Sequence, residues 1–234
     1  MRISMPLAVA LTAAATLTVT SHSTALSATT STEGAAAHHV AVRQSAGAYA
    51  YFPPNRPDRV VATWDRSIPV TYVIARRQAQ PRMLATIQEA FRRARVQTGI
   101  RFRYGGRVAT LKSIGTAQRP VVTIDFGTNR SHPRLAPYTG PVHAVGGPFL
   151  ITHDGTTSFT GGQITIDVAA TRGVGLGFRH SQLGATLMHE IGHVLGLTHV
   201  RSPGQLMAPG RIRANISGWF HDGDLAGLRR LIHS

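Results

Sequence analysis

The residues with the clearest capacity for chemistry lie together in the stretch HEIGHVLGLTH, which spans residues 189–199. His189 and His193 are four positions apart, so on a helix they lie on one face, one turn from each other. Two imidazoles in that arrangement can bind the same metal ion. Glu190 directly follows the first histidine, so its carboxylate would lie beside the ion and could reach a water molecule there. The spacing predicts a metal site with a general base next to it.

A glycine and a third histidine complete this stretch. Gly196 accepts a left-handed backbone conformation, so the helix can end there and the chain can turn back. The turn would bring His199 to the same ion as a third nitrogen ligand. Three histidines and one water make a tetrahedral zinc site with an open catalytic position. Zinc lowers the pKa of such a water, and Glu190 could pass its proton to a leaving amine, so the expected chemistry is hydrolysis of a peptide bond.

Histidines in ordinary polar contacts on a helix are the simpler alternative. The chain has 12 histidines, 24 glycines and only three glutamates among its 234 residues. At these frequencies, the five fixed positions of the stretch would coincide by chance in roughly 4 × 10⁻⁵ of chains of this length. A catalytic metal site is therefore the better interpretation.

The stretch resembles the HExxHxxGxxH signature of the metzincin zinc proteases. Met207 follows eight residues after His199 in the segment SPGQLMAP, between Pro203 and Pro209, which is similar to the methionine turn of the matrixin branch. The resemblance implies that Met207 lies as an apolar floor beneath the three histidines. It also implies a zinc endopeptidase with one catalytic Zn²⁺ ion, with Glu190 as the general base and with a protein or peptide as the substrate.

The periodicity of the surrounding sequence predicts the elements that hold this site. Apolar residues alternate at 68–74, which predicts a strand, and helical spacing predicts a helix that begins at Pro81 and ends before Gly99. A strand at 100–104 follows, so the crossover implies a parallel pair. The remaining predicted elements are strands at 120–126, 140–153 and 161–167, a loop at 154–160, a helix at 181–195 with Ser181 as its N-cap, and a helix at 224–232.

The order of these elements is similar to that of a matrixin catalytic domain. The resemblance implies an α/β (α+β) fold of the zincin or metzincin type. Such a fold has a twisted, mostly parallel five-stranded sheet, an active-site helix and a C-terminal helix. A substrate peptide lies antiparallel to its edge strand, and VHAVGG (142–147) occupies that place, which singles out His143, Ala144 and Val145. An ordinary inner strand is the alternative for this segment.

The N-terminus has the pattern of a secretory signal peptide. Arg2 precedes an apolar run that ends near Thr20, and small residues follow. A transmembrane anchor is the alternative, but the run is short for a span of about 20 residues. We expect residues 1–27 to be a signal peptide, 28–57 a linker or short pro-segment, and 58–234 the catalytic domain. The protein would then be secreted, extracellular and not held at a membrane, and it has no cysteine for a disulfide.

The charge balance suggests a second kind of partner. The formal net charge is +15, almost all of it from arginine, which favours attraction to anionic polymers unless arginine-rich coding alone explains it. The alternative function is a cationic secreted binding protein with a degenerate or structural zinc site. Glu190 favours the enzyme, because a structural site gains nothing from a neighbouring carboxylate. Ca²⁺ binding has weak support, since only ten acidic residues exist, among them the candidates Asp125, Asp154 and Asp167.

Overall fold

The computed structural model describes residues 49–55, 58–76, 80–109, 111, 115–138, 140, 142–209 and 217–233. All of them belong to one compact unit, Ala37–Ser234. The expected signal peptide (1–27) and most of the expected linker (28–48 and 56–57) lie outside the described residues. No helix in the described part of the chain has the length and apolar character that a membrane crossing needs.

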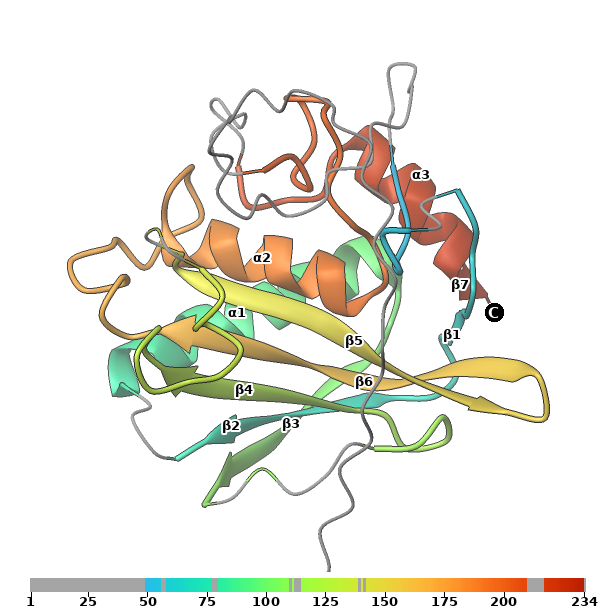
Figure 1. Cartoon of the computed structure of the whole chain (residues 1–234), viewed down its shortest axis with the longest axis horizontal. Helices are drawn as coiled ribbons and strands as arrows, with labels where there is room; N and C mark the ends of the chain where they lie inside the picture. Colours follow the sequence, from blue (N-terminus) through green and yellow to red (C-terminus); the bar gives the residue numbers. More distant parts are fainter. Residues whose placement is uncertain are drawn as a thin grey trace, which may run out of the picture. The chain divides into compact units, whose positions relative to one another are not determined.

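Five strands form the main sheet: β2 (Val70–Ala75), β3 (Phe102–Val108), β4 (Val121–Gly127), β5 (Ala144–His153) and β6 (Thr156–Asp167). Their order across the sheet is β3-β2-β4-β6-β5 (Figure 1). β2 pairs in parallel with β3 and β4, and β4 pairs in parallel with β6. Within this sheet only β5 runs antiparallel, to β6. The mostly parallel five-stranded sheet expected from the sequence is confirmed.

The segment between the last two strands is a hairpin turn and not the predicted loop. β5 and β6 are joined by Asp154 and Gly155 alone, which have φ values of 48° and 75°. Two successive residues with positive φ give a turn that follows the right-handed twist of paired strands. The prediction of a loop over 154–160 is wrong because Thr156 to Thr160 continue directly in β6. Threonine and phenylalanine have high strand propensity, so residues 156–160 continue as a strand after the turn.

Helix α1 (Pro81–Thr98) has the predicted bounds. Proline fits its first turn, where an N–H would have no partner within the helix, and Gly99 ends it in the left-handed conformation with φ 75°. The helix packs on the sheet through Phe91, whose ring stacks on Tyr72 of β2 with 4.0 Å between centroids. This contact identifies the face of the sheet that α1 covers.

Helix α2 (Leu183–Val194) covers the same face of the sheet. A Cβ built on Gly162 of β6 would lie 2.9 Å from the side chain of Val194. The strand register aligns Gly162 with Val122, and Val122 with Tyr72, so all three residues face the same way. Figure 1 shows α2 running along β5 with α1 behind it. The two helices and this face of the sheet enclose the core.

The opposite face of the sheet carries the loop of residues 128–138. Asp125 of β4 points to this face, because it is an odd number of positions from Val122. Its Oδ2 lies 3.1 Å from Nε2 of His132 in the loop. A Cβ built on Gly127 would lie 2.6 Å from Cβ of His132, so the loop rests directly on the end of β4.

The C-terminal helix α3 (Asp222–Leu231) begins two residues before its predicted start. Two short strands, β1 (Trp64–Asp65) and β7 (Ile232–His233), pair in parallel and bring the end of α3 to the start of the domain. Trp64 also donates from Nε1 to the carbonyl of Leu195, at 3.1 Å, just after α2. The first and last parts of the described chain therefore meet at the end of the histidine-bearing helix.

Glu89 on α1 forms a small charge cluster with two arginines. Its carboxylate lies 2.6 Å from Nε of Arg92 and 2.9 Å from Nε of Arg93. The hydrogen bond from Arg92, together with that from Arg93, lowers the pKa of Glu89 to about 2. The ionised form is thus favoured in the folded chain. Its contribution to stability is present above the ordinary glutamate pKa of 4.5 and is lost as the pH falls towards about 2.

We expect Glu89→Gln to lower the free energy of unfolding by about 0.5 kcal/mol at pH 7, because solvent screens a carboxylate that is 31% exposed. The difference between the two proteins should shrink as the pH falls below 4.5. Urea unfolding of wild type and variant at pH 7 and pH 3 measures it. An equal difference at both pH values would contradict the assignment.

Candidate metal centre and active site

The helix that carries the first two histidines begins two residues later than predicted. Ser181 has φ 65°, and Gln182 occupies the N-cap position without a side-chain cap. The prediction of Ser181 as the N-cap is therefore wrong. The N–H of Leu183 instead donates to the carbonyl of Gly175 at 2.9 Å. A backbone carbonyl of the preceding loop thus accepts a hydrogen bond from the first turn of the helix, where the side chain of Ser181 was expected to accept one.

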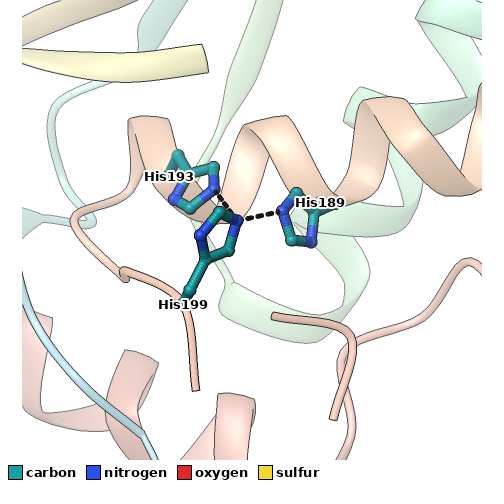
Figure 2. Close-up of side chains that lie close together, drawn as sticks. All are labelled: His189, His193 and His199. Carbon is teal, nitrogen blue, oxygen red and sulfur yellow. Dashed lines mark hydrogen bonds between the residues drawn. The ribbon is translucent and has the colours of Figure 1, made fainter. Parts of the chain in front are cut away.

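Three imidazoles converge at the other end of this helix (Figure 2). His189 and His193 project from α2, and His199 projects from the turn after it. Nε2 of His199 lies 3.1 Å from Nε2 of His189 and 3.2 Å from Nε2 of His193. Within the described ranges, no other group of three or more histidine and acidic side chains is arranged to hold a metal ion. The structure therefore brings together the three histidines that the sequence singled out.

The backbone fixes how these rings present their nitrogens. Nδ1 of His189 lies 2.7 Å from the carbonyl of Leu206, and Nδ1 of His193 lies 2.9 Å from the carbonyl of Leu197. A carbonyl can only accept, so each Nδ1 carries the proton and each Nε2 directs a lone pair towards His199. Converging lone pairs repel each other unless a cation lies between them.

The spacing of the nitrogens fits a zinc ion. Zn–N bonds of about 2.0–2.1 Å in a tetrahedron place ligand nitrogens roughly 3.3 Å apart. The two measured separations, 3.1 and 3.2 Å, are close to this value. Hydrogen bonds from the far nitrogen of a metal-binding histidine to backbone carbonyls are the usual means of orienting its ring. The donor set, its geometry and its supporting bonds are those of a Zn²⁺ site.

Gly196 makes the turn that returns the third histidine. Its φ is 105°, a conformation that residues with a side chain rarely adopt. A Cβ at this position would also lie 2.8 Å from the ring of Phe159. The chain reverses here and brings His199, three residues later, back towards α2. Another residue at position 196 would meet both backbone strain and a steric clash.

Residues 49–52 hold this turn in place. The N–H of Phe52 donates to the carbonyl of Gly196, and the N–H of Thr198 donates to the carbonyl of Ala50, both at 2.8 Å. These residues come from the segment expected to be a linker or pro-segment, and the structure packs them on the domain. The aromatic pair Tyr51-Phe52, within a stretch rich in alanine and glycine, was the available sequence signal.

Met207 lies directly behind the histidine-bearing helix. It is 1% exposed, and a Cβ built on Gly192 would lie 2.4 Å from its Sδ. Its carbonyl accepts from the N–H of Val200 at 3.2 Å, next to His199. The preceding residue, Leu206, supplies the carbonyl that orients His189. Leu206 and Met207, here called the methionine segment, are therefore hydrogen-bonded both to His189 on α2 and to the residue that follows His199.

Asp224 anchors the methionine segment, and sequence reasoning considered it only as a helix start. Its carboxylate accepts hydrogen bonds from the N–H groups of Leu206 at 2.8 Å, Met207 at 3.2 Å and His221 at 2.9 Å. Burial raises the pKa of Asp224, while these donors oppose the shift. Gln205, next to Leu206, makes bonds in the opposite direction: its Oε1 accepts hydrogen bonds from the N–H groups of Gly223 and Asp224 at the start of α3. The start of α3 and the segment below the histidines are thus one unit.

Glu190 lies where α2 meets the edge strand β5. It is 6% exposed, and a Cβ built on Gly146 would lie 2.7 Å from its carbonyl oxygen and 2.9 Å from its Cβ. Only glycine permits this close approach of strand and helix.

Two residues of the loop 128–138, Arg134 and Tyr138, interact electrostatically with Glu190. Burial lowers the pKa of Arg134, and Tyr138 and Glu190 oppose that shift. Burial and then the charge of Glu190 raise the pKa of Tyr138. Neither loop residue had a signal in the sequence.

The segment expected to bind substrate contains the first half of β5, which is an edge strand of the sheet. His143 lies just before the strand, and its carbonyl accepts from the N–H of Asp167 at 2.9 Å. Ala144 and Val145 are 4% and 8% exposed, so their side chains point into the protein. What this strand offers to a ligand is its backbone edge.

The acidic residues considered for Ca²⁺ do not gather into one site in the described part of the chain. Asp125 is engaged by His132, and Oδ1 of Asp167 accepts the N–H groups of Ala169 and Ala170. Asp154 lies at the hairpin turn, beside His153. Each carboxylate thus has a local structural partner.

Comparison with known proteins gives three findings. The sequence profile of the matrixin peptidase family matches residues 63–231. No curated protein sequence matches the chain. Among solved structures, an archaemetzincin from Methanopyrus kandleri is similar, with 14% sequence identity and a TM-score of 0.43 over 70% of this chain and 95% of that one.

Proposed function

Because the chain belongs to the matrixin family of zinc metallopeptidases, we propose that its three histidines and Glu190 form the catalytic centre of a secreted endopeptidase. The observation that carries the proposal is the convergence of three Nε2 atoms, two of them oriented by backbone carbonyls, beside a nearly buried glutamate. His189, His193 and His199 are the proposed ligands of the zinc ion.

The chain's own residues divide the work of hydrolysis. Bound Zn²⁺ supplies a Lewis acid that makes water a better nucleophile and polarises a carbonyl. Glu190 removes a proton from the attacking water and delivers it to the leaving amine nitrogen. Its low exposure keeps bulk water from competing for that proton. Gly196 and Met207 are proposed to support the ligands, the first by the turn and the second as an apolar floor against α2.

The edge strand β5 is the proposed substrate-binding element. An extended peptide can pair with the unpaired edge of a sheet through main-chain hydrogen bonds. β5 lies against Glu190 at Gly146, so a peptide on its outer edge would pass the catalytic centre. The carbonyl of His143 is bonded to Asp167 of β6, and backbone groups alternate between the two edges of an antiparallel strand, so among His143, Ala144 and Val145 it is Ala144 that would offer its N–H and C=O to a substrate. Export is supported by the signal-like pattern of residues 1–27.

Hydrolysis of denatured casein or a quenched fluorescent peptide by the purified protein tests this function. A zinc chelator should abolish cleavage, because the three-histidine site cannot act without its ion. After the chelator has been dialysed away, Zn²⁺ added in equal amount to the protein should restore cleavage. The control is the chelator complex with excess Zn²⁺, which should not inhibit. Cleavage that continues at the full rate after the metal has been removed would rule out the proposal.

A further inference from the structure

Arg134 lies against the edge strand on the face that points away from α2. A Cβ built on Gly147 would lie 3.5 Å from Nη2 of Arg134, whereas the neighbouring Gly146 faces Glu190. Successive residues of a strand point to opposite faces. The guanidinium group therefore rests on the outer strand of the sheet, across the strand from the catalytic glutamate.

The positive charge of Arg134 is only partly compensated. Nε is buried and has no hydrogen-bond partner within the described residues, and no carboxylate there forms an ion pair with the guanidinium. Burial lowers the pKa of Arg134, which reflects the loss of water around it. The charge of Glu190, on the other side of the strand, opposes that shift, whereas a carboxylate hydrogen-bonded to the guanidinium group would compensate its charge directly.

A substrate paired with β5 would bring side chains to this arginine. The side chains of an added strand alternate between the two faces of the sheet, as those of β5 do. The substrate residue opposite Gly147 would point to the face on which Arg134 lies. Gly147 has no side chain, so nothing on β5 separates that substrate residue from the guanidinium group.

We propose that Arg134 makes this peptidase select substrates with an acidic side chain at the position opposite Gly147. The carboxylate of such a residue would accept hydrogen bonds from the guanidinium group. The inference rests on the proposed function and on substrate pairing with β5. It names the substrate class as extended peptides with an aspartate or glutamate at one fixed distance from the cleaved bond.

A glutamate scan tests the proposal. Starting from an uncharged peptide that the enzyme cleaves, one glutamate is placed in turn at each position on either side of the cleaved bond. Every peptide then has the same net charge, so general attraction to a chain of net charge +15 cannot cause a difference. We expect the ratio of kcat/KM between the glutamate and glutamine peptides to be about tenfold higher at one position than at the others, as for a charge-assisted hydrogen bond.

Variants identify the residue responsible. Arg134→Gln should remove the glutamate preference, and Arg134→Glu should replace it with a preference for lysine at the same position. Arg103→Gln is the matched control, because Arg103 is exposed on β3 at the opposite edge of the sheet and the loss of charge is equal. The ratio between peptides is compared within each variant, so a change in overall rate or folding does not affect the result.

The outcomes separate the two proposals. A wild-type enzyme that cleaves the parent peptide without preferring glutamate at any position would overturn the role of Arg134. So would a preference that survives in Arg134→Gln. A protein that cleaves no peptide at all, with Zn²⁺ bound, would instead remove the proposed function and this inference with it.

Discussion

Glu190→Gln is expected to leave a folded protein that binds Zn²⁺ in equal amount to wild type but hydrolyses peptides about a thousandfold more slowly. The amide has the size of the carboxylate, so the contact with Gly146 is kept. It cannot take a proton from water. The carbonyls of Leu206 and Leu197 orient His189 and His193 without help from residue 190, so we expect metal binding to be kept.

The measurement combines kcat/KM on a fluorescent peptide with the zinc content of the dialysed protein. Glu89→Gln is the matched control, because it makes the same chemical change on the surface of α1 and should keep wild-type activity. Loss of zinc from Glu190→Gln would show that Glu190 has a role in the metal site itself. Wild-type turnover with zinc bound would contradict its role as the base.

Asp224→Ala should have the largest effect on stability, a decrease of about 3 kcal/mol or more in the free energy of unfolding. The substitution leaves three backbone N–H groups, those of Leu206, Met207 and His221, without their acceptor. Each buried donor without a partner costs about 1–3 kcal/mol. Because Leu206 also orients His189, zinc affinity should fall as well.

Urea unfolding and competition with a zinc-binding dye measure both effects. Asp222→Ala is the control, since Asp222 lies in the same helical turn but is exposed, and its loss should change stability by less than about 0.5 kcal/mol. Equal destabilisation by the two variants would mean that helix charge, and not the bonds to the methionine segment, is what matters at Asp224.

The parts of the site that follow from spacing along one helix and its turn could be predicted from the sequence. The interval between His189 and His193 is fixed by helix geometry, and Gly196 is the residue that a reversal requires. The bounds of α1 also followed from local signals, Pro81 at its start and Gly99 at its end. Such signals act over a few residues, and tertiary contacts did not shift the ends of this helix.

What could not be predicted depends on residues that meet only in the folded chain. Asp224 looks like an ordinary first-turn acid until the Leu206 segment is placed beside it. Arg134 is one arginine among many, and only its position against Gly147 sets it apart. The expected cap at Ser181 failed for the same reason, since a loop carbonyl from Gly175 satisfies the helix instead. The propensities of neighbouring residues do not show which hydrogen-bonding group another segment places beside them in the folded chain.

The hydrogen bond from Trp64 to Leu195 joins groups that are 131 residues apart, and it lies beside the turn that returns His199. Contacts of such long sequence separation form late, because most of the loop-closure entropy must be lost first. On a growing chain, Trp64 and residues 50–52 cannot bond their partners until synthesis has passed residue 198. The order of synthesis itself therefore delays the moment at which the enzyme can first cut.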